Sequence, residues 1–233
     1  MISVVIPTYN EERNIVKCLK SLNNQSIPRK DYEIIIVDGK STDRTVEIAK
    51  KYVKKIITQK PSDPFGIEGA RHLGFLQTKY DLIATTDADC RVPKTWLENI
   101  IETLRQEKCV CVYGPLKLYG KYNFLERMNF LQELGSFFNV HYTIGANTAF
   151  VKKYYFKCGG YSDFGAIEDW EISFRIRKHG SIKYNKKMYI YYSTRRLEKL
   201  GFIGFSYDLL RNFANRFILK KRISNYAKQK YDS

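Results

Sequence analysis

Residues 2–12 read ISVVIPTYNEE, and this stretch sets the pattern for the chain. The β-rich run at residues 2–6 ends at Pro7 and predicts a short buried strand. After a polar loop, two acids open a segment at residues 11–25 whose apolar side chains recur at helical spacing, and acids favour the first turn of a helix. A strand, a loop and a helix therefore form the first unit.

The same unit repeats along the first half of the chain. Residues 32–38 (YEIIIVD) predict a strand that ends at Asp38, and Thr42 or Asp43 can cap the helix predicted at 45–53. Strands that alternate with helices need crossover connections, so we predict an α/β fold with a mostly parallel mixed sheet flanked by helices. Further strands are predicted at residues 55–58, 81–87 and 109–115, and further helices at 69–78 and 95–107.

The pattern is less regular beyond residue 115. An amphipathic helix is predicted there, followed by a strand, a helix and a strand, at residues 122–138, 147–153, 168–180 and 187–193. Residues 199–233 predict a basic amphipathic helical extension, whose apolar face carries Phe202, Phe205, Leu209, Phe213 and Phe217. This tail either packs on the domain or lies on a membrane with its aromatic rings at the headgroup boundary, and we favour membrane contact.

Composition places the chain among folded proteins, with 44% hydrophobic and 27% charged residues. The five cysteines, an odd number without CxxC spacing, are expected to be free thiols of a reducing compartment. The first residues lack a signal-peptide pattern, and no stretch reaches the roughly 18 apolar residues of a membrane-spanning helix. We therefore expect a cytoplasmic protein, peripheral at the inner face of the cell membrane if the tail binds lipid.

Positive charge is concentrated in the last quarter of the chain. The net charge is +16, and residues 175–233 contain 16 Lys and Arg against 3 Asp and Glu. Such a region suits phosphate-rich partners, namely nucleic acid, an anionic membrane or a phosphorylated substrate. No helix-turn-helix, RNA-binding sheet motif or metal finger is recognisable. We expect no nucleic acid, although a basic nucleic-acid-binding protein stays an alternative.

Two aspartates end the stretch DLIATTDADC at residues 81–90. Asp87 and Asp89, separated by Ala88, would point the same way at the carboxyl end of a strand, where α/β sheets bind ligands. The alternative to a ligand site is a solvated turn in which Asp87 and Asp89 simply face water. Like charges this close are unfavourable without a cation, and carboxylates suit Mg²⁺ or Mn²⁺ held together with substrate phosphates. The sequence therefore predicts a divalent metal and a diphosphate substrate.

Asp38 is the second candidate, at the end of the strand predicted for residues 32–38. In a dehydrogenase such an acid binds ribose, but that function needs a glycine fingerprint after the first strand. The first loop instead reads PTYNEE, without glycine. We therefore expect Asp38 to contact a nucleotide base or ribose, with a helix-capping carboxylate as the alternative.

Six short motifs occur in the order and spacing of one enzyme family. They are VVIPTYNEE (4–12), VDGKSTDRT (37–45), GARHLG (69–74), TDADC (86–90), GAN (145–147) and EDWEISFRI (168–176). Over about residues 1–195 the chain resembles family 2 glycosyltransferases with the GT-A fold. This resemblance implies a GT-A-like domain at 1–198, with a nucleotide-binding part at about 1–115 and an acceptor part at about 116–198.

The resemblance also implies a role for each matched residue. The donor nucleotide would contact the motif residues Pro7, Thr8, Tyr9, Glu11, Asp38, Arg71, Asp87, Ala88 and Asp89, with Asp38 on the base and Arg71 near the diphosphate. Asp89, together with Asp87, would hold the divalent ion. Asp169, rather than Glu168 beside it, would be the general base. Gly145, Ala146 and Asn147 would help form the acceptor side.

The implied reaction is metal-dependent, inverting transfer of a hexosyl group from a UDP- or GDP-linked sugar to a sugar or a lipid-linked acceptor. A polyprenyl-phosphate-linked acceptor fits a membrane-bound tail. The chain lacks the QxxRW motif of processive synthases, so we expect single additions, with Arg195 and Arg196 near acceptor or donor phosphate. A sugar-phosphate nucleotidyltransferase is an alternative, although its glycine-rich first loop is absent.

Overall fold

The computed structural model describes residues 1–60, 62–63, 66–118, 124–141, 143–161 and 168–193, and beyond them Gly204, Tyr207 and Arg211. For residues 118, 124–128 and 168 it describes the backbone only. The predicted tail at 199–233 therefore lies almost wholly outside the described residues, and so do Arg195 and Arg196. The division of the chain into two parts and a tail stays a prediction.

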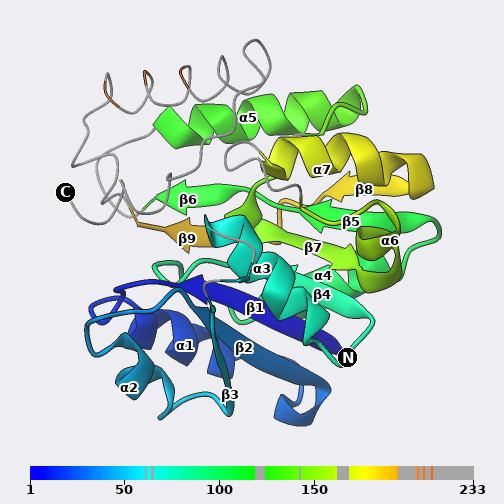
Figure 1. The fold of residues 1–233 in the computed structure, drawn as a ribbon. Helices are drawn as coiled ribbons and strands as arrows, with labels where there is room; N and C mark the ends of the chain where they lie inside the picture. The colour runs from blue at the N-terminus through cyan, green and yellow to red at the C-terminus, as the bar shows by residue number, and fades with distance from the viewer. Residues whose placement is uncertain are drawn as a thin grey trace.

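Strands and helices alternate through the first half of the chain and less regularly after it (Figure 1). The strands are β1 (Ile2–Thr8), β2 (Tyr32–Asp38), β3 (Lys55–Thr58), β4 (Leu82–Thr85), β5 (Cys109–Tyr113), β6 (Leu116–Leu118), β7 (Thr148–Val151), β8 (Ser181–Tyr184) and β9 (Ile190–Tyr192). The α-helices are α1 (Ile15–Asn23), α2 (Thr45–Ala49), α3 (Gly66–Leu76), α4 (Trp96–Leu104), α5 (Phe124–Phe137), α6 (Lys152–Lys157) and α7 (Glu168–Ile176). Short 3-10 helices are η1 (Arg29–Asp31), η2 (Gly145–Asn147) and η3 (Arg177–His179).

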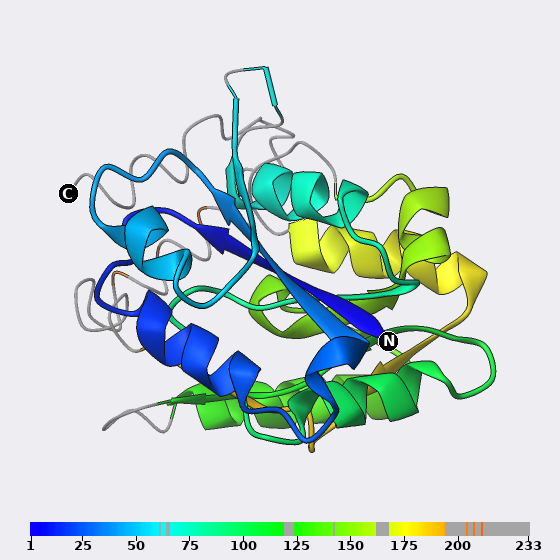
Figure 2. The ribbon, with the colours of Figure 1, turned by 90° about the horizontal axis from the view of Figure 1, so that it is seen from below.

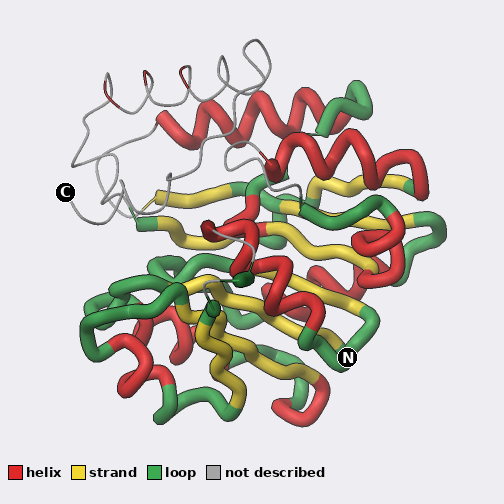
Figure 3. The backbone as a smooth tube through the Cα atoms, in the orientation of Figure 1, coloured by secondary structure: helices red, strands yellow, loops and turns green. Residues whose placement is uncertain are grey.

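Seven strands form one mixed sheet in the order β3-β2-β1-β4-β7-β5-β8, and β6 pairs with β9 beside it. The pairs β2/β3, β1/β2, β1/β4 and β5/β8 are parallel, whereas β7 runs antiparallel to both β4 and β5. Figure 3 shows the strands in yellow between helices in red. The predicted α/β fold, with a mostly parallel mixed sheet flanked by helices, is confirmed.

Two hydrophobic cores cover the two faces of this sheet, because alternate residues of a strand point to opposite sides. On one face Val4 and Ile6 pack with residues of α1 and α4, including the fully buried Trp96. On the other face Val5 packs with α3, α6 and α7, including the fully buried Phe75. Figure 2 shows α1 (blue) on one side of the strands and α3 (cyan) and α7 (yellow) on the other.

The second half of the chain differs more from the sequence prediction. The predicted strand at 147–153 ends at Val151 and continues as α6, and β8 follows the helix predicted at 168–180 without a matching prediction. Strand β9 lies within the strand predicted at 187–193, whereas β6 and its pairing with β9 were not predicted. Within the described ranges, no helix combines the length and the apolar character needed to cross a bilayer.

Candidate functional site

The ends of four strands meet at one edge of the sheet. Parallel pairing places Thr8, the last residue of β1, opposite Asp38, the last residue of β2, and β4 ends on the other side of β1. Antiparallel pairing then places Thr148, the first residue of β7, opposite Thr85, the last residue of β4. The loops after β1, β2 and β4 and the η2 turn before β7 therefore converge, as ligand-binding loops do in α/β sheets.

The carboxylate of Asp38 orders the loop that follows β2. It accepts hydrogen bonds from the backbone N–H groups of Lys40 and Ser41, both at 3.1 Å, and from the Ser41 hydroxyl at 2.5 Å. Asn10 ties this loop to the one after β1, since its N–H donates to Ser41 Oγ and its side-chain oxygen accepts from the Thr42 N–H. Asp38 thus faces its own loop. The roles of Asn10 and Ser41 in ordering this loop were not predicted from the sequence.

Glu11 is buried at the start of α1. Its N–H donates to Thr45 Oγ1 at 2.7 Å, and its carboxylate accepts from Asn14 Nδ2 at 2.6 Å. Asp43 accepts from the N–H groups of Thr45 and Glu12, so it caps α2 as the sequence suggested. Although burial raises the pKa of Asp43, these hydrogen bonds bring the pKa below its ordinary value. The first helical turns are therefore fixed before any ligand binds.

The remaining residues that were predicted to contact the donor lie on β1 and just after it. Pro7 and Thr8 are buried within the last two positions of the strand, and Tyr9 is half-buried directly after it. Thr8 Oγ1 bonds back to the Ile6 carbonyl. The structure therefore brings Tyr9, rather than Pro7 or Thr8, closest to solvent at this strand end.

Asp87, Ala88 and Asp89 form a turn directly after β4. Ala88 is buried, whereas both aspartates are half-buried. Carboxylate oxygens of Asp87 and Asp89 and the Cys90 sulfur lie within 4.8 Å of one another. Burial, with the two nearby carboxylates, raises the pKa of the Cys90 thiol well above its ordinary value, so the neutral thiol is a poor ligand. The two carboxylates that remain are the donor set that Mg²⁺ or Mn²⁺ prefers.

The guanidinium of Arg71, on α3, joins two acids from distant parts of the chain. Arg71 is only 3% exposed. Its Nη2 donates to Asp87 Oδ1 at 2.8 Å, and its Nη1 lies 3.7 Å from Asp169 Oδ1. A charge this deeply buried is tolerated only when opposite charges compensate its desolvation. Arg71 therefore fixes the distance between the turn after β4 and the start of α7.

Asp169 is half-buried in the first turn of α7. Burial raises the pKa of its carboxyl to about 6, and the charges of Glu68 and Asp87 act in the same direction, whereas Arg71 and the N–H of Gly145 oppose them. The backbone carbonyl of Asp169 accepts a hydrogen bond from the Thr143 hydroxyl. A carboxylate with a pKa close to neutrality and a fixed backbone can act as a general base. The side chain of Glu168 lies outside the described part of the structure.

Gly145 lies where Arg71 and Asp169 meet. A Cβ at this position would be 2.6 Å from Asp169 Oδ1 and would overlap the guanidinium of Arg71. Only glycine lets the backbone come this close, and its N–H then reaches the Asp169 carboxylate. The GAN motif therefore touches Asp169 through its glycine.

Asn147 is fully buried, unlike a residue that contacts a substrate directly. Its side-chain oxygen accepts from Trp96 Nε1 at 2.9 Å, and its Nδ2 donates to the carbonyls of Met188 at 2.7 Å and Pro115 at 3.2 Å. Asn147 thus holds three segments together beneath the site. Ala146 is buried next to it, and the acceptor role of residues 145–147 stays a prediction.

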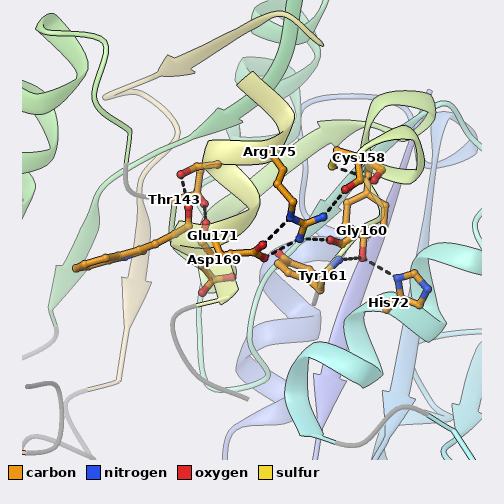
Figure 4. Close-up of polar contacts among 11 residues, drawn as sticks. His72, Thr143, Cys158, Gly160, Tyr161, Asp169, Glu171 and Arg175 are labelled. Atoms are coloured by element: carbon orange, nitrogen blue, oxygen red, sulfur yellow. Dashed lines mark hydrogen bonds and ion pairs between the residues drawn. The ribbon is translucent and has the colours of Figure 1, made fainter. Parts of the chain in front are cut away.

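A second network around α7 was not predicted from the sequence (Figure 4). Arg175 Nε and Nη2 each donate to the Glu171 carboxylate at 2.7 Å. The same guanidinium donates to the carbonyls of Gly160, at 2.6 Å, and Cys158. Arg175 thereby fastens the segment that ends at Tyr161 to the helix that carries Asp169. The signal in the sequence is an acid and an arginine four residues apart on one helix.

Gly145→Ala tests the close approach of the backbone at position 145 to Arg71 and Asp169. We expect the free energy of unfolding to fall by about 2 kcal/mol, because the added methyl group forces Arg71 and Asp169 apart. The matched control is Gly39→Ala, in the loop after β2, where an added Cβ meets its nearest atom at 3.4 Å. Denaturant unfolding of both variants checks this, and equal stabilities would contradict it.

Arg175→Ala tests the network around α7. We expect the free energy of unfolding to fall by about 2 kcal/mol, because the buried carbonyl of Gly160 and the Glu171 carboxylate lose their donor. Arg44→Ala is the control, since Arg44 pairs with Glu47 in full exposure, and surface pairs of this kind contribute little. Melting curves of the two variants measure the difference. A control variant as unstable as Arg175→Ala would refute the assignment.

Comparison with known proteins points to one family. The model of Glycosyl transferase family 2 matches residues 3–163, more than half of the chain. The probable glycosyltransferase YdaM of Bacillus subtilis (strain 168) is 29% identical over 197 residues, which cover 77% of this chain and 47% of that protein. The dolichyl N-acetyl-alpha-D-glucosaminyl phosphate 3-beta-D-2,3-diacetamido-2,3-dideoxy-beta-D-glucuronosyltransferase of Methanococcus voltae is 54% identical over 54 residues, 23% of this chain and 17% of that protein. The chain thus spans less than half the length of these relatives.

Solved structures share the fold. TarS 1-349 of S. aureus in complex with UDP-GlcNAc has a TM-score of 0.68 at 18% identity, covering 82% of this chain and 58% of that one. The mannosyltransferase PcManGT of Pyrobaculum calidifontis, in complex with GDP-Man and Mn²⁺, has a TM-score of 0.68 at 17% identity. The match covers 90% of this chain and 64% of that one. At such identities the likeness concerns the fold, which confirms the GT-A prediction. Together with the match over residues 3–163, it shows that the chain belongs to glycosyl transferase family 2.

Proposed function

We propose that this protein is an inverting glycosyltransferase that moves a sugar from a nucleoside-diphosphate sugar to an acceptor hydroxyl or phosphate. The observation that carries the proposal is the Arg71 guanidinium, which joins Asp87 of the DAD turn to Asp169. The carboxylate that would hold the metal ion beside the leaving diphosphate and the carboxylate that would take the acceptor proton are thereby tied to one cation. Family membership argues against a sugar-phosphate nucleotidyltransferase and a nucleic-acid-binding protein.

The donor would bind over the loops after β1 and β2. We assign Tyr9 and Glu11 to the nucleotide side, with Pro7 and Thr8 forming the floor beneath them and Asp38 toward the base. The tie between Asn10 and Ser41 supports this placement, because it holds the two loops in one arrangement that a nucleotide can bind without ordering them. UDP-GlcNAc and GDP-Man in the two solved structures support a nucleoside-diphosphate sugar as the donor.

Asp87 and Asp89 would hold a divalent ion, Mg²⁺ or Mn²⁺, through carboxylate oxygens close enough to share one cation. Such an ion supplies charge neutralisation on the departing diphosphate. The Mn²⁺ in the mannosyltransferase structure supports this choice of ion class. Arg71 would add a second positive charge beside the diphosphate, and Asp87 holds it in place at 2.8 Å.

Asp169 would act as the general base, in preference to Glu168. The acceptor oxygen attacks the anomeric carbon, the bond from that carbon to the diphosphate oxygen breaks, and the acceptor proton passes to Asp169. Attack opposite the leaving group inverts the anomeric centre. The pKa of about 6 supports this role, because the carboxyl is ionised at neutral pH and still accepts a proton readily.

The acceptor would lie over the η2 turn, on the side of Gly145. Arg195 and Arg196 would contact its phosphate or that of the donor. We propose a lipid-linked acceptor of the polyprenyl-phosphate type, and the Methanococcus voltae relative supports this, since its name describes transfer to a dolichyl phosphate-linked sugar. The cytoplasmic location and the membrane contact of the tail belong to the same proposal.

Donor binding is tested by thermal shift with UDP-GlcNAc, UDP-glucose and GDP-mannose, each with and without Mn²⁺. We expect one donor to stabilise the protein in the presence of Mn²⁺, by about 2.7 kcal/mol when its free concentration is about a hundredfold above Kd. Asp89→Asn should lose most of this shift, whereas Glu102→Gln, an exposed acid on α4, should keep it. A panel in which no donor shows a metal-dependent shift would overturn the donor assignment.

Asp169→Asn tests the base. We expect release of the nucleoside diphosphate from the bound donor to slow by at least about a hundredfold, while the thermal shift with donor remains. In the natural chain the rate should fall as the pH drops through about 6, because Asp169 becomes protonated and cannot accept another proton. Initial rates between pH 5 and 8, with Glu107→Gln as control, measure both effects. An unchanged rate in Asp169→Asn would exclude it as the base.

A further inference from the structure

Helix α5 carries its apolar side chains on the outside. Phe130 is 63% exposed, Leu131 55%, Leu134 45%, Phe137 83%, and Phe138, just past the last turn, 67%. Their spacing of one, three, three and one residues places all five on one side of a helix. These five residues are called the α5 outer face below.

Among the described side chains of α5, two polar ones, Asn129 and Gln132, face the domain. The Asn129 side chain accepts from the Leu116 N–H at 3.1 Å and donates to the Leu116 carbonyl at 2.6 Å, which fixes the helix to β6. Gln132, one turn on, is buried, and the Tyr184 hydroxyl reaches the Asn129 carbonyl. Asn129 therefore fixes the described part of the helix to β6, while the apolar side chains at 130, 131, 134, 137 and 138 face outward.

From the sequence, the stretch at residues 122–138 could form part of the same membrane-facing surface as the tail or cover the acceptor site. Single exposed apolar residues are normal on protein surfaces, but a contiguous group indicates an interaction site. Elsewhere in the described ranges, large exposed apolar side chains stand far apart in the sequence, at Met1, Leu76, Phe174 and Tyr207. Within the described part of the chain, the α5 outer face is therefore the one contiguous group of large exposed apolar side chains.

Basic side chains are exposed on elements that neighbour α5 and its C-terminal end. The ion pair described for the half-buried acid Glu133 joins it to Lys186 at 2.6 Å, so this acid is neutralised. Lys183 is exposed on β8, which packs against α5, and Arg177 is exposed on η3, just before β8. Both cations act on His141, three residues past Phe138, whose pKa burial and these charges lower to about 4. Figure 1 shows α5 beside α7 and β8 at one end of the molecule.

We propose that the α5 outer face docks on the surface of an anionic lipid bilayer. Aromatic and leucine side chains enter the headgroup boundary, while flanking lysine and arginine meet the negative lipid headgroups. A second copy of this chain fits the surface less well, because each copy carries a net charge of +16 and the copies repel each other. This surface consists of described residues and is distinct from the predicted tail at 199–233.

Docking through α5 would bring the base to the lipid surface. The chain leaves α5 at Phe137 and returns at Thr143, whose hydroxyl bonds to the backbone of Asp169. A bilayer beneath α5 therefore lies next to the acceptor side of the site. This suits an acceptor whose sugar or phosphate is anchored in the membrane, and the bilayer contact itself does not depend on the transfer reaction.

Vesicle binding by the full chain tests the proposal. The vesicles contain phosphatidylcholine with about one third phosphatidylglycerol, and pure phosphatidylcholine serves as the neutral comparison. We expect co-sedimentation with the anionic vesicles that weakens at high salt. Phe130→Ser/Phe137→Ser should bind at least about tenfold more weakly, because two aromatic anchors are lost. Leu76→Ser, which removes an exposed leucine from α3, should bind as the natural chain does.

Two further measurements separate the alternatives. Brominated lipid should quench the fluorescence of the tryptophan in Phe137→Trp, but not that of the tryptophan in Leu76→Trp. If Phe213→Ser/Phe217→Ser in the tail abolishes binding while Phe130→Ser/Phe137→Ser leaves it unchanged, the proposal is wrong. It is equally wrong if no vesicle binds, or if light scattering shows a dimer that Phe130→Ser/Phe137→Ser dissociates. The donor-induced thermal shift, measured without vesicles, should be the same in these variants, so failure of docking is distinguishable from failure of the proposed function.

Discussion

The guanidinium of Arg71 lies almost out of solvent between Asp87 and Asp169, and the site takes its shape from this contact. A buried cation requires nearby anions, and these two anions come from the turn after β4 and from the start of α7. The same cation opposes the burial that raises the pKa of Asp169, so the carboxyl titrates close to neutrality instead of well above it. Structure and acid–base chemistry therefore depend on one interaction.

The sequence predicted much of this site because its residues stand at the ends of strongly patterned strands. Asp38 ends a run of four β-branched residues, and Asp87 follows β4, so parallel pairing alone brings their loops together. What these side chains contact was not predictable. Asp38 bonds to its own loop, and Asn147 is buried against Trp96, because both contacts depend on the packing of segments distant in the sequence.

The fold was predicted better in the first half of the chain than in the second. Strand β2 coincides with the predicted range 32–38, because four consecutive β-branched residues leave little doubt about strand structure. Strand β8 (SIKY) has one β-branched residue in four, whereas β3 (KIIT), equally short and at the other edge of the sheet, has three and was predicted. In α5 the periodicity predicted the helix and left its orientation open, because hydrophobic spacing does not say whether the partner of a face lies within the chain or outside it.

Gly145 lies at a junction between the first and the second half of the chain. Its backbone touches Arg71, which α3 supplies from the first half, and Asp169, which α7 supplies from the second. A chimera that joins the first half of one relative to the second half of another would have to keep Gly145, Arg71 and Asp169 compatible, because their contact leaves no room for a larger residue at position 145. Such chimeras should therefore succeed only when the crossover keeps this junction intact, whichever donor or acceptor each half selects.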